Sequence, residues 1–180
     1  MKKIGLILVV CLALAALTAC TDSSKNEETT QAEETAATDN NSENDTSADA
    51  AAFTYKGTAI AMKADAAAIL EALGEAKHYT ETTSCAFDGL DKEYTYTSFV
   101  ITTYPTGDED FINSVTLVDD TVSTPEGICI GDAQDKVEEV LGADLFNGVN
   151  AYIRTEGDTM LTVIITDGVV SSIQYTAVFE

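Results

Sequence analysis

The sequence MLTVIITDGVVSSIQYTAV, residues 160–178, indicates an antiparallel β-hairpin. Two runs rich in β-branched residues flank the dipeptide Asp167-Gly168. Asp-Gly between two such runs is a strong signal for a two-residue hairpin turn, because both turn positions need positive φ angles. We therefore predict strands over Met160–Thr166 and Val169–Val178.

A similar pattern occurs earlier in the chain. Residues 93–104 are dense in Tyr, Thr, Phe, Val and Ile, and a polar loop follows at 105–110. The tetrapeptide at 112–115, INSV, then resembles VSSI at 170–173. We predict strands over 93–104 and 111–118, with shorter strands near 84–87 and 149–154.

Two further segments resemble each other 68 residues apart, one starting at Ile60 and the other at Ile128. Each begins with a short apolar alternation, continues with helix-favouring residues and ends at a glycine, Gly74 or Gly142. Glycine is the usual residue just past a helix end. We predict helices near 65–73 and 132–141, the second capped by Asp132.

These elements predict one α+β domain over residues 53–180, which hold all 13 aromatic residues of the chain. Each half contains a helix followed by antiparallel strands, in repeats of about 55–120 and 121–180. Neither half has enough apolar area for a secure core, so we expect the two repeats to form one sheet with the helices on one face.

The domain is strongly acidic, with 22 acidic and six basic residues and therefore a net charge of −16. Such a field repels nucleic acid and anionic lipid headgroups, and it favours cations or a basic partner. Acidic side chains also keep a surface protein soluble, and that role alone is the alternative interpretation.

The N-terminus resembles the signal peptide of a bacterial lipoprotein. Lys2 and Lys3 precede an apolar run, and the run ends at Leu17-Thr18-Ala19-Cys20. This ending resembles the lipobox, which implies cleavage of residues 1–19 and lipidation of Cys20 with acyl chains such as palmitate. The protein would then be a lipid-anchored lipoprotein on the extracytoplasmic face of the cell membrane. An uncleaved anchor or an ordinary cleaved signal is the alternative.

Residues 20–52 predict a disordered acidic linker after the lipidated cysteine. From residue 21 to residue 52 the chain has nine acidic residues against Lys25, and its apolar residues are all alanine. Such a composition cannot bury enough apolar surface to offset the entropy of ordering. A stalk that holds the domain away from the bilayer and a plain solvated spacer are both consistent with it.

Two cysteines remain in the domain, Cys85 and Cys129. A disulfide between them could persist outside the cytoplasm. Two buried thiols that act as small apolar side chains are the alternative.

The domain sequence resembles uncharacterised surface lipoproteins of Firmicutes. The segments that carry this likeness are 84–92, 94–96, 103–105, 119–120 and 124–132. The layout of helix and then strands, repeated twice, is similar to the fold of β-lactamase inhibitory protein and of small outer-membrane assembly lipoproteins. This resemblance implies a two-repeat α+β binding module, and it names no partner.

Motifs for catalysis or metal binding are absent from the sequence, and we predict no catalytic residues, metal or cofactor. The domain has one histidine, His78, and neither a Gly-x-Ser-x-Gly elbow nor a His-Glu-x-x-His motif. Carboxylates are abundant in three turns, at 88–93, 108–110 and 119–120. Solvated turn residues, a weak cation site and paired catalytic acids are the three interpretations of these clusters.

We therefore expect a non-enzymatic module for protein binding or assembly, tethered to the membrane. Its partners would be the lipid bilayer, through the anchor on Cys20, and a protein of unknown identity, but no nucleic acid. The candidate binding face carries four tyrosines, which suit interfaces but could equally pack in the core: Tyr94, Tyr96, Tyr104 and Tyr175. A carboxylate-based cell-wall hydrolase and a divalent-cation-binding protein are the alternative functions.

Overall fold

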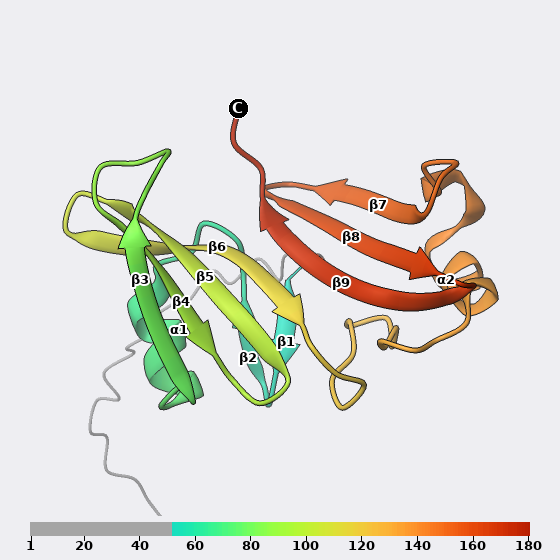
Figure 1. The fold of residues 1–180 in the computed structure, drawn as a ribbon, viewed down its shortest axis with the longest axis horizontal. Coiled ribbons are helices and arrows are strands. Elements are labelled where there is room, and N and C mark those ends of the chain that lie inside the picture. Colours follow the sequence, from blue (N-terminus) through green and yellow to red (C-terminus); the bar gives the residue numbers. More distant parts are fainter. Residues whose placement is uncertain (1–51) are drawn as a thin grey trace, which may run out of the picture. The chain divides into compact units, whose positions relative to one another are not determined.

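The computed structural model describes residues 52–180, all within one compact unit. Nine strands form two sheets, of seven and two strands (Figure 1). The elements are β1 (Phe53–Tyr55), β2 (Thr58–Ile60), α1 (Ala66–Leu73), β3 (His78–Thr83), β4 (Leu90–Thr95), β5 (Phe99–Thr106), β6 (Glu109–Leu117), α2 (Gln134–Leu141), a 3₁₀ turn (Ala143–Leu145), β7 (Ala151–Glu156), β8 (Thr159–Thr166) and β9 (Val169–Ala177). The large sheet is antiparallel throughout, in the order β3-β4-β5-β6-β9-β8-β7.

The predicted hairpin at Asp167-Gly168 is confirmed. It joins β8 to β9, and Thr166 pairs with Val169 across the turn. Both turn residues have positive φ, 52° at Asp167 and 79° at Gly168, as a two-residue turn of this type requires. The turn therefore sets the first two residue pairs, Thr166 with Val169 and Ile165 with Val170, before the register shifts between Ile164 and Ile165.

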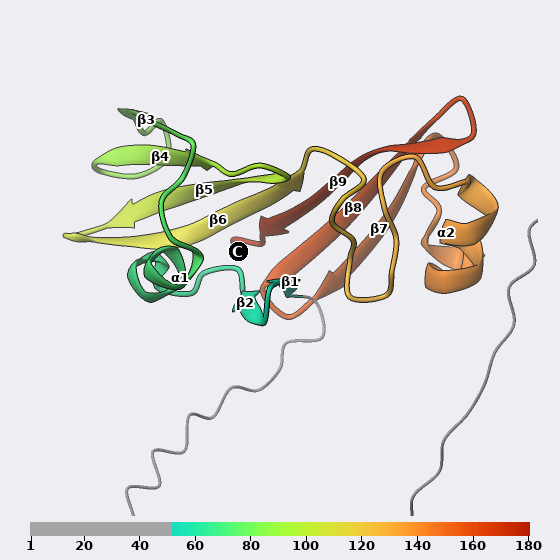
Figure 2. The same cartoon turned by 90° about the horizontal axis from the view of Figure 1, so that it is seen from below.

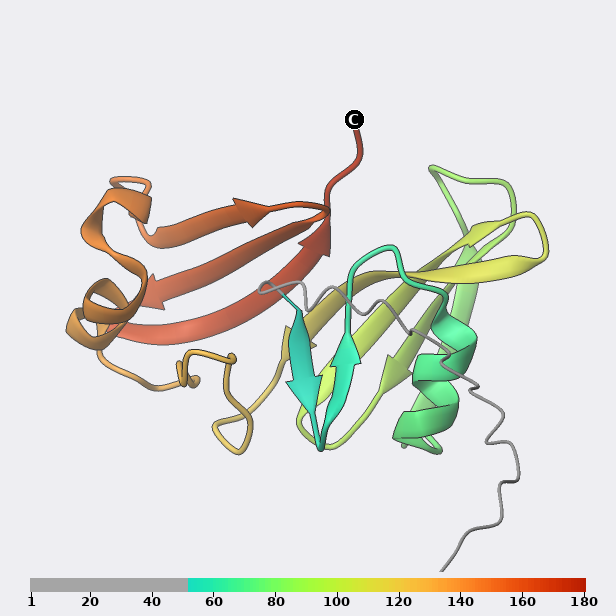
Figure 3. The same cartoon turned by 180° about the vertical axis from the view of Figure 1, so that it is seen from behind.

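The core lies against one face of the large sheet, which we call the inner face. Figures 2 and 3 show that α1 and the β1–β2 hairpin lie on this side. Phe53, at the start of β1, is fully buried, with its ring centroid 5.3 Å from that of Phe99 and 6.0 Å from that of Tyr175. The first strand therefore contributes directly to the same core as the last.

Both predicted helices form, and both are eight residues long. Asp65 caps α1 by accepting a hydrogen bond from the Ala67 N–H, 2.8 Å away. Asp132 does not cap α2, because the N-cap is Ala133 and makes no side-chain bond. The Asp132 carboxylate instead accepts from the Cys129 N–H and from the Lys136 ammonium.

Equivalent pairs of backbone hydrogen bonds attach the chain before each helix to the sheet. Before α1, the Lys63 N–H donates to the Ile112 carbonyl and the Ile112 N–H donates to the Ala64 carbonyl. Before α2, the same two bonds join Gly131 and Asp132 to Val170. The segments before the helices therefore bond to parts of β6 and β9 that lie outside the four residue pairs joining these two strands.

The predicted α+β class is wrong, because the described residues form a mostly β fold. Two helix-plus-strand repeats do not make up the domain. Each helix buries one residue completely, Ala66 in α1 and Val137 in α2. The middle of the inner face is instead filled by non-helical segments that contribute Phe53, Ile60 and Ile128 to the core. Short helices cannot cover seven strands, so strands and loops supply most of the apolar contact.

Two of the predicted strand positions are also wrong. Residues 93–104 are not one strand, because the chain turns after β4, and the Tyr96 N–H donates to the Phe99 carbonyl across that turn. Residues 84–87 belong to a loop in which the Ser84 hydroxyl accepts from the N–H groups of Ala86 and Phe87. The strand on this side of the sheet is β3, at 78–83.

The predicted signal peptide (1–19), the lipidated Cys20 and the acidic linker (20–52) lie outside the described residues, apart from Ala52. Within residues 52–180, neither α1 nor α2 has the length and apolar character needed to cross a membrane.

Candidate functional site

The outer face of the seven-stranded sheet lies opposite the core, on the side away from α1 and the β1–β2 hairpin (Figures 2 and 3). Figure 1 looks onto this face, and the helices lie behind it (Figures 1 and 3). Two rows of directly paired residues cross all seven strands on this side. In the order of the strands, the first row is His78, Thr95, Val100, Thr116, Gln174, Thr162 and Ile153, and the second is Thr80, Glu93, Thr102, Ser114, Thr176, Met160 and Thr155.

These fourteen residues, which we call the open face, are almost uncharged. Eight carry hydroxyl groups, three are apolar, and Glu93 is the only one with a formal charge. All except Ser114 are half-buried or exposed. A surface with one carboxylate stands out in a domain with a net charge of −16.

Side-chain hydrogen bonds order the centre of the open face. The hydroxyls of Thr102 and Ser114 lie 2.7 Å apart, and the Gln174 amide donates to the Thr116 hydroxyl at 3.2 Å. Each of these bonds joins side chains on neighbouring strands. The face is therefore partly preorganised, which lowers the entropy lost when a partner binds.

An aromatic cluster borders the open face beyond a bulge between Thr102 and Thr103. Tyr104 lies at its centre, with ring centroids 4.7 Å from Phe87, 5.8 Å from Phe111 and 5.1 Å from Phe179. Phe179 is 47% exposed, and the Lys63 ammonium lies 5.2 Å from its ring centroid. This cluster adds apolar area at one margin of a polar surface.

The four predicted tyrosines do not share one surface. Tyr175 is fully buried on the inner face, and burial raises its pKa. Tyr96 and Tyr104 are 9% and 8% exposed, and the Tyr96 hydroxyl donates to the Gly74 carbonyl. Tyr94 is half-buried against Tyr79, with 5.1 Å between ring centroids. Tyr96 and Tyr175 therefore pack in the core, and Tyr104 is buried in the aromatic cluster beside the open face. Most of the four are thus buried, which was the alternative left open by the sequence.

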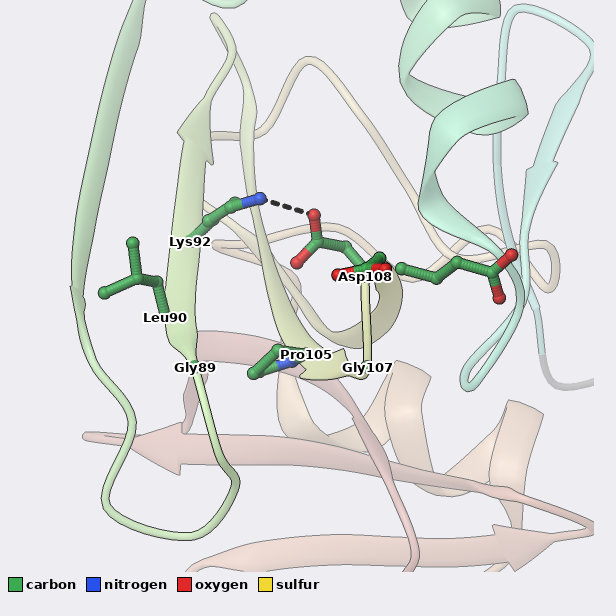
Figure 4. Close-up of a pocket in the computed structure, with 8 residues that line it drawn as sticks. Gly89, Leu90, Lys92, Pro105, Gly107 and Asp108 are labelled. Carbon is green, nitrogen blue, oxygen red and sulfur yellow. Dashed lines mark hydrogen bonds and ion pairs between the residues drawn. The ribbon is translucent and has the colours of Figure 1, made fainter.

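The acidic turn at 108–110 borders a small hollow of about 160 Å³ between β4 and the β5–β6 hairpin (Figure 4). Lys92 points across it to Asp110, with 2.5 Å between the ammonium and the carboxylate. This hydrogen bond raises the pKa of Lys92. Asp110 already neutralises Lys92, so the hollow keeps at its rim the charges of Asp108 and Glu109, which form no ion pair within residues 52–180.

A larger hollow of about 380 Å³ borders the same turn and is also lined by the start of α1 and by Tyr94. The third acidic turn is engaged locally, because the Asp119 carboxylate accepts two hydrogen bonds from Thr121 that lower its pKa. Within residues 52–180, no group of three or more His, Cys, Asp or Glu side chains is placed to hold a metal ion.

Glu126, in the loop before α2, forms an ion pair with Arg154 on β7. Both side chains are about one-quarter exposed, and in the described part of the chain the Arg154 Nε and Glu126 Oε2 atoms have no hydrogen-bond partner. Sequence analysis missed this pair because the two residues are 28 positions apart and no local pattern relates them.

Within residues 52–180, Cys85 and Cys129 are free thiols and form no disulfide. Cys85 is exposed in the β3–β4 loop, and Cys129 is half-buried before α2. In comparisons with known proteins, no family model, curated protein or solved structure matches this chain.

Proposed function

We propose that this protein is a lipid-anchored module on the extracytoplasmic face of the cell membrane, which binds a protein partner through the open face. The observation that carries the proposal is the charge distribution. Fourteen paired side chains across seven strands hold one carboxylate, whereas the rest of the domain is densely acidic. Interface centres are typically depleted in charged residues.

The acidic residues around the open face would determine which partners can bind. Charged groups around an uncharged centre steer association and exclude like-charged proteins, and they add little affinity themselves. A partner with a polar, uncharged centre and a basic rim therefore fits this surface best. The hydroxyls of Thr162 and Thr176 are placed to exchange hydrogen bonds with such a partner.

Site-specific photo-crosslinking in intact cells tests the open face. A crosslinking residue at Gln174, which is exposed on the open face, should capture a protein of one discrete mass. The same residue at Val149, which is 80% exposed in a loop, serves as the matched control and should capture none.

Binding should also depend on the neutrality of the face. Thr162→Arg places a charge beside Gln174 and should abolish the Gln174 crosslink, whereas Val149→Arg should preserve it. Equal capture from both positions, or a crosslink that survives Thr162→Arg, would contradict this function.

The anchor is tested separately. Cys20→Ala should release the protein into the medium, because without lipidation no acyl chain holds it to the bilayer. Retention of this variant in the membrane fraction would contradict the lipoprotein assignment and leave the crosslinking result unaffected.

A further inference from the structure

The open face has a carboxylate near one end and apolar side chains near the other. Glu93 on β4 and Met160 on β8 belong to the same row of paired residues, four strand spacings apart. Neighbouring strands lie about 4.8 Å apart, so about 19 Å separates the two positions. Between them the row contains only hydroxyl-bearing residues, which are Thr102, Ser114 and Thr176. The open face is therefore chemically polarised along this row.

Glu93 is exposed, and its carboxylate forms no ion pair within residues 52–180. Its directly paired neighbours are Thr80 and Thr102, which carry no charge. Asp91, two residues earlier on β4, faces the same side and adds a second negative charge. A carboxylate that a partner covers without pairing it loses its hydration at a large cost in free energy. A partner that covers this end of the row must therefore bring a cation to it.

The opposite end of the row offers apolar contact. Met160 is half-buried, and Ile153, its diagonal neighbour on β7, is 37% exposed. Arg154, the next residue on β7, belongs to the inner face and is already paired with Glu126. A methionine side chain is flexible and adapts to the shape of an apolar side chain that packs against it. This end therefore suits an uncharged, apolar part of a partner.

We propose that the protein partner of the open face carries a basic side chain opposite Glu93 and an apolar side chain opposite Met160, about 19 Å apart. This inference rests on the proposed function and specifies the partner of that same surface. The two ends of the row differ, so a reversed partner would set its cation against Met160 and leave Glu93 unpaired. The partner therefore docks in one orientation. Charge complementarity of this kind contributes mainly to specificity and to the rate of association.

Photo-crosslinking from the two ends of the row tests the orientation. Probes at Thr80, exposed beside Glu93, and at Thr155, exposed beside Met160, should each capture the protein that the Gln174 probe captures. Mass spectrometry should map the Thr80 crosslink next to a lysine or arginine of the partner, and the Thr155 crosslink to a different, apolar segment. Probes that both capture the same mixture of segments would show two orientations and overturn the proposal.

Charge changes at Glu93 test the cation. Glu93→Gln should lower the yield of the Gln174 crosslink about threefold, and Glu93→Lys about tenfold because reversal adds repulsion. Glu71→Lys, the same charge change at an exposed position of α1 on the inner side, should leave the yield intact. Added salt should lower the wild-type yield more than the Glu93→Gln yield. Glu93→Gln alters only the charge, so its effect separates loss of the cation contact from loss of folding.

A charge placed at the apolar end tests the second contact. Ile153→Glu should lower the yield of the Gln174 crosslink about tenfold, whereas Val140→Glu, at an exposed position of α2, should leave it intact. A crosslink that is unaffected by Glu93→Lys or by Ile153→Glu would overturn this inference and leave the proposed function in place. A Gln174 probe that captures no protein would overturn both.

Discussion

The Arg154 guanidinium and the Glu126 carboxylate form an ion pair that fastens the loop before α2 to β7. Burial alone would raise the pKa of Glu126, but the hydrogen bond from Arg154, with others from the backbone and Thr124, lowers it below its ordinary value of 4.5. The pair therefore stabilises the folded state when Glu126 is ionised.

Arg154→Ala should reduce the free energy of unfolding by about 2 kcal/mol at pH 7, between the effects of exposed and fully buried pairs. A group with a lowered folded-state pKa contributes stability above its ordinary pKa and loses it as the pH falls. The difference between wild type and variant should accordingly shrink below about pH 4.5. Urea unfolding at pH 7 and at about pH 3.5 measures both quantities. The double variant Glu126→Gln with Arg154→Met should recover most of the loss, and a pH-independent difference would contradict the role of this pair.

Tyr175→Phe should leave stability unchanged at pH 7 or raise it by up to about 1 kcal/mol. The Tyr175 hydroxyl is buried and has no hydrogen-bond partner among the described residues, so its removal relieves a desolvation cost. Burial, followed by the charge of Glu126, raises the pKa of Tyr175 above its ordinary 10. Wild type should therefore lose stability as the pH rises above about 10, and the variant should lose less. Urea midpoints at pH 7 and at about pH 11 test this, and equal alkaline losses would count against it.

Phe53→Ala should destabilise the domain by about 4 kcal/mol, because it empties a fully buried site beside Phe99. Phe179→Ala makes the same change at a ring that is 47% exposed, and should cost about 1 kcal/mol. Thermal unfolding of both variants of the full chain gives the comparison. Similar effects from both would mean that β1 is not part of the core.

Gly89→Ala should destabilise the domain by about 3 kcal/mol. Gly89 has a φ of 131°, and an added Cβ would lie 2.9 Å from the Pro105 ring beside the hollow in Figure 4. Gly107→Ala, also at positive φ but with no atom within 4 Å, should lose about 1 kcal/mol from backbone strain alone. Urea unfolding separates the two, and equal losses would show that contact with Pro105 is unimportant.

Local signals in the sequence predicted local structure well. Asp167-Gly168 specifies its turn through backbone conformation, and Asp65 and Gly74 mark the ends of α1 through hydrogen bonding and positive φ. The turn after β4 was missed because Tyr96 has a strong strand propensity, and only pairing across the turn breaks the run. β3 was missed because an edge strand exposed on both faces has no alternation of apolar and polar residues.

The fold class and the open face depend on information that the sequence does not carry locally. An eight-residue helix shows the same spacing of apolar residues whether it covers the middle of a sheet or only one corner. The apolar faces of α1 and α2 therefore suggested a larger helical layer than the one that forms. The two rows of the open face form only when all seven strands pair, because each row takes one residue from every strand. Tyr175 illustrates the ambiguity, since a tyrosine in a strand suits an interface and a core equally.

The burial of Phe53 also determines how the domain can be presented. Because β1 lies on the inner side of the sheet, a chain that enters the domain through Phe53 joins it on the side opposite the open face (Figure 2). In the proposed lipid-anchored protein, the hydroxyl rows of the open face would therefore lie on the side of the domain away from the attachment.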